Sequence, residues 1–432
     1  MVQTDKLLKV TANLLGRESA IPGFGLLLDP ERLLAGLSGQ LDINKVEDIK
    51  LNYLRYKPGM NCLARYELTT QGQNIKAYAK AHGEDAVNKM GKSMERPVID
   101  GALGPGRAVI GDQQVIFSTF PNDAKLASLQ CLSNSSYRQR LLSRVFGPDS
   151  EWQDSSFGQA LNYKPERRYV ARLTRADGES ALVKFYSRSG YAKARAISRK
   201  LNRNRHSFYP ETIGRSKKHS VVAYHWQPGT TLRQLSTDGK LTTSDLVATA
   251  ESLAEFHASG RQGLSFVGLD EQIRRLDALS EQLVFLLPHL HKRAKSVVHK
   301  LAQWLGARVA VIQAVHGDFY DKQAIMNNGR ISLIDLDGAH LGNPLLDLGS
   351  YMAHLERLAV NHGISPADVN AQKDALVGAY EQMTGSTCSE QLDKYTALGL
   401  FVLIHHPFRD WAQDWPQQTE HLLKRVEDLY AA

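Results

Sequence analysis

The sequence predicts an α+β protein with antiparallel β-hairpins in its first half and helices in its second. Two observations carry this prediction: a set of residues recurs at one fixed spacing in the first half, and long helical patterns begin after Gly229. At 432 residues the chain is too long for one ordinary core, so two or three domains are expected. Its 42% hydrophobic and 23% charged residues are typical of a globular protein.

The recurring residues lie 107 positions apart. The first set is Tyr56, Lys57, Pro58, Ala64 and Arg65, and the second is Tyr163, Lys164, Pro165, Ala171 and Arg172. In each copy a β-like run with a central lysine follows, Lys80 in the first and Lys184 in the second. Each pair of runs is typical of a hairpin. We interpret the pattern as a duplicated unit; chance similarity of two antiparallel hairpins is the alternative.

Capping and stop residues predict helix boundaries at several places in the sequence. Asp29 followed by Pro30 is typical of a helix start, because the aspartate can cap the first turn and proline suits its first position. A further helix is predicted over Thr243–His257, with Gly260 as its stop.

The formal net charge of +8 favours an anionic partner, and nucleic acid, acidic lipid and nucleotide phosphates all remain candidates. The stretch Lys193–Arg205 is a basic helix face, either solvated or polyanion-binding. Three cysteines lie far apart without metal-type spacing, which indicates a reducing compartment. The first residues show no basic start followed by an apolar core, and no run of about 18 apolar residues occurs. We therefore expect a cytoplasmic protein without a membrane partner.

The most informative stretch is His316–Gln323, followed by Ile331–Asp337. Phosphoryl transfer needs a carboxylate that deprotonates the attacking hydroxyl, an oxygen ligand for magnesium, and a second carboxylate between metal and phosphates. Asp318, Gln323 and Asp335 fit these roles, with strand-end capping as the alternative for the two aspartates. An Asn-Gly hairpin turn separates the two runs, so both carboxylates are expected at one edge of the same small sheet.

These motifs resemble the aminoglycoside phosphotransferase and choline kinase family, relatives of the protein kinases. Three further stretches are similar to that family: Val222–Leu232 to its hinge, Leu253–Gly260 to a helix end, and Gly342–Gly349 to the segment after the metal site. The resemblance covers about Tyr163 to at least Leu355. It implies a bilobal protein-kinase-like fold with an N-terminal cap that looks like a duplicated small lobe. The implied domains are a cap (1–155), a small lobe (156–227) and a helical catalytic large lobe (228–432).

The resemblance also implies a role for each site residue. Asp318 would be the catalytic base. The implied magnesium ligands are Gln323, Asp335 and Asp337, and the implied nucleotide contacts are Lys184, Arg167, Arg168 and Tyr224. For Asp337 a turn role remains open, and Asp347 is expected to cap a helix or loop.

The chain departs from the family pattern in three ways. Gln323 replaces the usual asparagine, although its amide oxygen can still bind a metal. No glutamate between Gly190 and Arg205 is available to pair with Lys184, and no Gly-rich loop precedes Val170. Maltokinase-like sugar kinases are similar to this chain in having an N-terminal cap and a glutamine in the catalytic loop.

The acceptor site is the least determined part. Its candidate residues are His316, Arg409, Asp410, Trp411 and Asp414. Aromatic faces and carboxylates suit a sugar or an amine; amphipathic packing is the alternative for the C-terminal residues, and holding the loop is the alternative for His316.

Together these features imply an ATP- and Mg²⁺-dependent phosphotransferase, a small-molecule kinase with a hydroxyl acceptor. The expected acceptor is a sugar, an amino sugar or an aminoglycoside. A catalytically weak or inactive kinase-like nucleotide-binding module is the alternative. A nucleic-acid partner rests on charge alone and is not expected.

Overall fold

A computed structural model describes residues 2–83, 90–91, 94–201, 209–259, 263–308, 311–362 and 364–431. The chain forms two compact units. The first comprises Met1–Ala192, Ile213–Ala223 and His406–Pro416, and the second comprises Lys193–Thr212, Tyr224–His405 and Gln417–Ala432. The predicted helix stop at Gly260 and the end of the predicted basic stretch, 202–205, lie outside the described residues.

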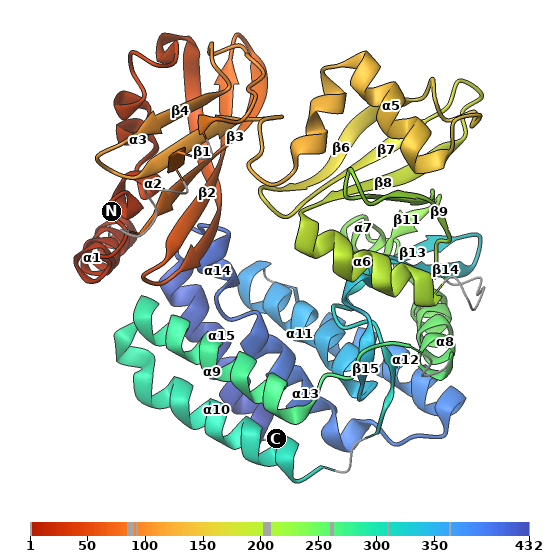
Figure 1. Ribbon diagram of the computed structural model, residues 1–432. Coiled ribbons are helices and arrows are strands. Elements are labelled where there is room, and N and C mark those ends of the chain that lie inside the picture. The colour runs from red at the N-terminus through yellow and green to blue at the C-terminus, as the bar shows by residue number, and fades with distance from the viewer. Residues whose placement is uncertain are drawn as a thin grey trace. The chain divides into compact units, whose positions relative to one another are not determined.

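The first unit contains two five-stranded sheets with the same strand order (Figure 1). The first sheet runs β1-β2-β3-β5-β4 and the second β6-β7-β8-β10-β9. The strands of the first sheet are β1 (Val46–Lys57), β2 (Asn61–Thr70), β3 (Gln73–His82), β4 (Arg107–Ile110) and β5 (Val115–Thr119). Those of the second are β6 (Ser156–Lys164), β7 (Arg168–Thr174), β8 (Ser180–Tyr186), β9 (Thr212–Ser216) and β10 (Val221–His225). The predicted hairpins are confirmed, while duplication stays an interpretation of the shared order.

The two lysines of the repeat occupy equivalent positions in their sheets. Lys80 in β3 pairs with Leu63 in β2, and Lys184 in β8 pairs with Val170 in β7. Leu63 and Val170 are themselves 107 positions apart. The sequence repeat is therefore also a repeat of backbone pairing.

Helix α5 (Ser135–Phe146) lies over the second sheet, as Figure 1 shows. Leu142 of this helix and Trp152 after it are buried in one core with Tyr163 and Val183 of the sheet. The sequence analysis assigned residues 1–155 to the cap. The segment around α5 nevertheless contributes its apolar side chains to the core of the second sheet.

Two predicted helices have the expected starts. Helix α3 (Pro30–Gly36) begins with Asp29, whose side chain accepts a hydrogen bond from the Arg32 amide at 3.1 Å. Helix α8 (Thr243–Ala258) begins with a capping box between Thr242 and Asp245. Both caps satisfy main-chain amides that have no partner within their helix.

The second unit is mostly helical and carries two small sheets. Besides α8, its long helices are α9 (Leu269–Leu286), α10 (His291–Gly306), α11 (Leu345–His362), α12 (Pro366–Thr384), α13 (Ser389–Val402) and, from Gln417 onward, α15 (Trp415–Ala431). One sheet has the order β11-β13-β14 and the other pairs β12 with β15. These strands are β11 (Thr230–Thr231), β12 (Gln313–Val315), β13 (Ala324–Asn327), β14 (Arg330–Leu333) and β15 (His340–Gly342). Among the described helices, none is long and apolar enough to cross a membrane.

Gly229, just before β11, shows why the hinge segment needs a glycine. Its φ is +122°, and an added Cβ would lie 2.2 Å from the main-chain oxygen of Met326 in β13. No other residue type fits such a close backbone approach without displacement. The glycine therefore lets β11 pair with β13 at Thr230 and Met326.

A buried carboxylate in the β6–β7 turn ties the two sheets of the first unit together. Glu166 has a side chain 4% exposed and accepts hydrogen bonds from Lys80 Nζ at 2.8 and 3.0 Å. Arg55 of β1 donates to the same carboxylate at 3.2 Å, and Lys125 lies 3.4 Å from it. Burial would raise the pKa of Glu166, but Lys80, Lys125 and Arg55 outweigh it and hold that pKa below its usual value. Lys80 is thus committed to an ion pair.

Replacing Lys80 tests this ion pair. We expect Lys80→Met to lower the free energy of unfolding at pH 7 by about 2 kcal/mol, because it removes one of three cations around a buried carboxylate. Since the folded pKa of Glu166 is depressed, its stabilising contribution is present above the unfolded pKa and is lost as pH falls through the folded pKa. Urea denaturation at pH 7 and pH 3 measures both effects.

The matched control is Lys45→Met, which removes an ammonium with a side chain 44% exposed, beside Asp42. Its unfolding midpoint should match that of the unaltered protein. An equal loss of stability in both variants would contradict a special role for Lys80, as would a Lys80→Met effect that stays constant between pH 7 and pH 3.

Candidate active site

The candidate catalytic loop follows β12 and is held by a buried aspartate. Asp347, in the first turn of α11, is 0% exposed. Its carboxylate accepts hydrogen bonds from the main-chain amides of His316 at 2.6 Å and Gly317 at 2.9 Å. The prediction that Asp347 caps a helix or loop is therefore confirmed, and the capped element is this loop.

A second layer of side chains supports Asp347. Its Oδ2 lies 3.1 Å from Nε2 of His257, near the end of α8, and the His257 Nδ1 is 2.7 Å from the hydroxyl of Tyr380 in α12. Burial would raise the pKa of Asp347, but hydrogen bonds from His257 and His316 and the nearby imidazoles hold it below its usual value. The carboxylate therefore stays ionised and keeps accepting from the loop.

His316 is a structural residue in this geometry. It is 0% exposed, and its Nε2 lies 2.8 Å from the main-chain oxygen of Ile334, beyond β14. A wholly buried ring bonded to the backbone does not favour a substrate contact, and the substrate role of His316 stays a prediction. The alternative, that it holds the loop, agrees with these contacts.

Gly317 gives the loop its sharp turn. Its φ is +79°, and an added Cβ would lie 2.6 Å from the main-chain oxygen of Gly338. Glycine is thus required both by the backbone conformation and by the space. The turn leaves Asp318 on an exposed stretch, while Phe319 returns to the core.

Asp318 and Asp335 come from different sheets, which corrects one prediction. Asp318 follows β12, which pairs with β15, whereas Asp335 follows β14 of the three-stranded sheet. The predicted strand also ends earlier, because β14 stops at Leu333 and Asp335 adopts a left-handed conformation with φ +61°. Aspartate tolerates this conformation better than most residues.

Asp318 and Asp335 both influence the titration of Tyr320. Burial raises the pKa of Tyr320 to about 12, and the negative charges of Asp318, Asp335 and Asp321 contribute to that increase. The ring itself is fixed by stacking on His354 of α11 at 4.1 Å between centroids. The expected shared sheet is therefore wrong, while the roles of Asp318 and Asp335 stay predictions.

Gln323 has the surroundings of an oxygen ligand. Its backbone is fixed, since its amide donates to Tyr320 at 2.8 Å and its carbonyl accepts from Ile334 at 2.9 Å. Its side chain is almost buried, at 6% exposed for the residue, yet it forms no hydrogen bond among the described residues. Such an amide suits a metal that also takes ligands from carboxylates, phosphates and water.

The three proposed magnesium ligands, Gln323, Asp335 and Asp337, stay a prediction. Their oxygen donors are of the kind that magnesium binds. Asp335 directly precedes the short turn after β14, and Asp337 lies within that turn. Ile334, the residue before Asp335, donates its main-chain amide to the carbonyl of Gln323. Across the described part of the chain, no group of three or more His, Cys, Asp and Glu side chains is arranged to hold a metal. The predicted set has two carboxylates and an amide, so a site here needs the phosphates and water as further ligands.

Sequence reasoning missed an ion pair beside the loop. Asp321 is buried and accepts from Arg233 of helix α7 (Leu232–Thr237), with 3.0 Å between Nη2 and Oδ1. The pair anchors the segment between Asp318 and Gln323. An arginine directly after the predicted hinge segment is too common a pattern to identify the ion pair.

The predicted nucleotide contacts lie mainly in the first unit. Lys184 is buried in β8, Arg167 is exposed in the β6–β7 turn, and Arg168 begins β7. Tyr224 lies in β10, at the point where the chain passes into the second unit. All four stay predictions. Glu166 in this turn was not predicted to have a role. It lies 107 positions after Gly59, and both residues have a positive φ.

The predicted acceptor residues near the C-terminus also belong to the first unit. Arg409 donates to Asp410 at 3.0 Å and lies 2.6 Å from the His406 ring, so its charge is already shared. The neighbouring Phe408 packs edge to face on Trp411 and on Tyr56 of β1. These contacts agree with the alternative that the segment serves packing. A substrate role stays a prediction for Arg409, Asp410, Trp411 and Asp414.

Several solved structures are similar to this chain. A thermostable mutant of aminoglycoside phosphotransferase APH(4)-Ia has 16% identity and a TM-score of 0.47, covering 64% of this chain and 95% of its own. A choline/ethanolamine kinase family protein from Mesorhizobium loti has 14% identity and a TM-score of 0.49, covering 70% and 95%. A putative fructosamine-3-kinase from Thermobifida fusca has 16% identity and a TM-score of 0.46, covering 69% and 100%. No curated protein matches the chain.

The family assignment rests on a family model, not on these structures. The model described as the phosphotransferase enzyme family, APH, matches residues 163–386, just over half of the chain. That range includes the second sheet from Tyr163 onward, the candidate catalytic loop and Asp347, and it excludes the first sheet. The match confirms the expected α+β, protein-kinase-like fold class, while the nature of the N-terminal cap stays a prediction. The chain belongs to the phosphotransferase enzyme family.

Proposed function

We propose that the protein is an ATP-dependent phosphotransferase that transfers the γ-phosphoryl group to a hydroxyl of a sugar, amino sugar or aminoglycoside. One observation carries the proposal: in a chain of the phosphotransferase family, buried Asp347 holds the loop that exposes Asp318, and the nearly buried amide of Gln323 follows five residues later. Phosphoryl transfer depends on positioned carboxylates and a metal far more than on covalent chemistry by the protein.

Asp318 is the proposed base. It is exposed, so an acceptor hydroxyl can reach its carboxylate. As the hydroxyl oxygen bonds to the γ-phosphorus, the bond to the β,γ-bridging oxygen breaks, ADP leaves, and Asp318 takes the hydroxyl proton. Gln323, Asp335 and Asp337 are the proposed holders of Mg²⁺, which supplies positive charge to the phosphates when bound. Asp321 is not proposed as a base or metal ligand, because its carboxylate is paired with the Arg233 guanidinium.

A screen for ADP release tests the function directly. Purified protein with ATP and Mg²⁺ is incubated with sugars, amino sugars, aminoglycosides or choline. We expect at least one of the first three classes to raise ADP release above the acceptor-free rate. Nucleotide binding without acceptor-dependent release would favour the alternative, an inactive nucleotide-binding module. Stimulation by choline alone would overturn the acceptor class.

Asp318→Asn tests the base. The change keeps the shape of the side chain and removes its proton affinity, so kcat should fall by roughly 10²–10⁴-fold while nucleotide affinity stays the same. Asp374→Asn, an exposed change on α12 in the same unit, is the matched control and should keep full activity. Turnover by Asp318→Asn close to that of the control would remove Asp318 from the mechanism.

Asp335→Asn tests the metal ligand. Asparagine accepts the left-handed conformation as readily as aspartate, so the fold should be kept while a charged ligand becomes neutral. We expect the Mg²⁺ concentration for half-maximal activity to rise by about tenfold or more. Nucleotide binding measured without Mg²⁺ should not weaken. An unchanged Mg²⁺ requirement would argue against this ligand.

The two equivalent lysines make the last comparison. Lys184→Ala should raise the KM for ATP or lower kcat by about tenfold or more, since a charge-assisted phosphate contact is lost. Lys80→Ala should change either value by no more than about twofold, because its ammonium is committed to Glu166. Its effect should appear in stability instead. The opposite ranking would mean that the first sheet supplies the nucleotide lobe.

A further inference from the structure

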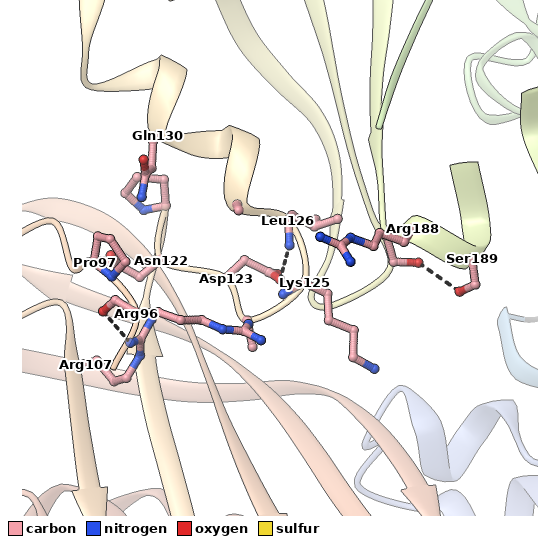
Figure 2. Close-up of a pocket in the computed structure, with 14 residues that line it drawn as sticks. Arg96, Pro97, Arg107, Asn122, Asp123, Lys125, Leu126, Gln130, Arg188 and Ser189 are labelled. Carbon is pink, nitrogen blue, oxygen red and sulfur yellow. Dashed lines mark hydrogen bonds between the residues drawn. The ribbon is translucent and has the colours of Figure 1, made fainter. Parts of the chain in front are cut away.

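The first unit contains an open pocket of about 650 Å³ outside the candidate active site (Figure 2). Its walls come from three separate parts of the chain: the residues around Arg96 and Arg107, the segment from Pro121 to Gln130, and the first residues of α6 (Arg188–Leu201). None of the residues assigned above to phosphotransfer lines it. The volume is in the range of sites for small molecules.

Positive charge dominates the lining. Four cations line the pocket, Arg96, Arg107, Lys125 and Arg188, against one carboxylate, Asp123. Because Lys125 already lies 3.4 Å from Glu166, the three arginines carry the remaining positive charge. In Figure 2, Arg96 extends into the pocket from one side and Arg188 from the other. Cations from separate elements that face one cavity create a positive potential that attracts anions.

Among the described residues the Asp123 carboxylate forms no ion pair with these cations, because neutral donors hold both of its oxygens. Oδ1 of Asp123 accepts from the main-chain amides of Lys125 at 2.7 Å and Leu126 at 3.0 Å. Oδ2 accepts from the hydroxyl of Tyr163 and the amide of Glu166, at 2.9 and 2.8 Å. Asp123 therefore shapes the wall of the pocket, and its single negative charge offsets only part of the charge of the three arginines.

Two of the arginines have no counter-charge of their own. In the described part of the chain, neither Arg96 nor Arg188 has a side-chain ion pair or hydrogen bond. Arg107 is 8% exposed and donates to the main-chain oxygen of Arg96 at 3.2 Å, so these two cations are neighbours. Burial lowers the pKa of Arg107, and the charge of Arg96 adds to that lowering. An anion between them would relieve this repulsion.

The pocket walls are held in place without a ligand. The side-chain amide of Asn122 accepts from the Ile99 amide at 2.8 Å and donates to the Ile99 oxygen at 2.9 Å, which fixes the segment carrying Arg96. On the α6 side, the Ser187 hydroxyl accepts from the Gly190 amide at 3.3 Å and lies 3.5 Å from that of Ser189. Walls fixed in this way lower the ordering cost of binding.

We propose that this pocket binds a small phosphorylated molecule, with Arg96, Arg107 and Arg188 as the phosphate contacts. Guanidinium groups match phosphate oxygens with paired hydrogen bonds, and three of the four cations are arginines. The Ser187 and Ser189 hydroxyls are further donors on the same lining. The lining shares no residue with the proposed nucleotide contacts, so the protein would carry a second place for phosphate-bearing ligands.

Calorimetric titration with inorganic pyrophosphate tests the proposal, with sulfate at equal ionic strength as the comparison. The test variant is Arg96→Gln combined with Arg188→Gln, both exposed positions whose replacement should not disturb folding. The matched control is Arg32→Gln, an exposed arginine on α3 of the same unit. We expect the unaltered protein and the control to bind pyrophosphate equally, and the double variant to bind about tenfold or more weakly.

A pyrophosphate-dependent increase in Tm gives a second reading, since a ligand of the folded state stabilises it. This increase should occur in the unaltered protein and in Arg32→Gln, and should shrink in the double variant. Equal binding by the double variant would mean that pyrophosphate binds elsewhere, and would overturn the proposal. No binding to the unaltered protein, or equal binding of sulfate and pyrophosphate, would overturn it as well.

Discussion

The buried carboxylate of Asp347 is the interaction on which the candidate site depends. A carboxylate with no solvent exposure needs donors, and Asp347 receives the amides of His316 and Gly317 together with the ring of His257. These bonds join the start of α11 and the end of α8 to the loop that carries Asp318. The proposed base is therefore positioned by residues that need no contact with substrate, and disturbing them would leave buried amides unsatisfied at about 1–3 kcal/mol each.

In the first unit, the buried carboxylate of Glu166 likewise fixes a turn through its hydrogen bonds. It is a second buried carboxylate in a turn, and its donors Lys80 and Arg55 come from the first sheet. The lysine at the register position of Lys184 thus has a structural partner in the first sheet. If the two sheets arose by duplication, Lys80 of the first copy binds Glu166 in the β6–β7 turn of the second copy. The Lys80 ammonium is then engaged in that ion pair.

The positive charge of the chain is not spread evenly over its functional regions. The negative charges of Asp318, Asp321 and Asp335 all raise the pKa of Tyr320, whereas four cations line the pocket that includes Arg96 and Arg188. An acidic cluster needs a metal before it can approach phosphates, while an arginine-lined pocket binds phosphates directly. The net charge of +8 is consistent with both environments and distinguishes neither.

The sequence by itself determined the local elements and the residue types of the site. The 107-residue repeat predicted both hairpins, and Asp29 and Pro30 predicted the start of α3. Spacing and resemblance also supplied Asp318, Gln323 and Asp335, whose roles stay predictions. Such signals are local because turns, caps and hairpins depend on neighbouring residues. Only the tertiary structure decided that β12 pairs with β15, that Arg233 takes Asp321, and that Glu166 faces Lys80. These contacts join residues roughly 30 to 90 positions apart, and pairing at such distances follows from packing of the whole unit, which no local pattern encodes.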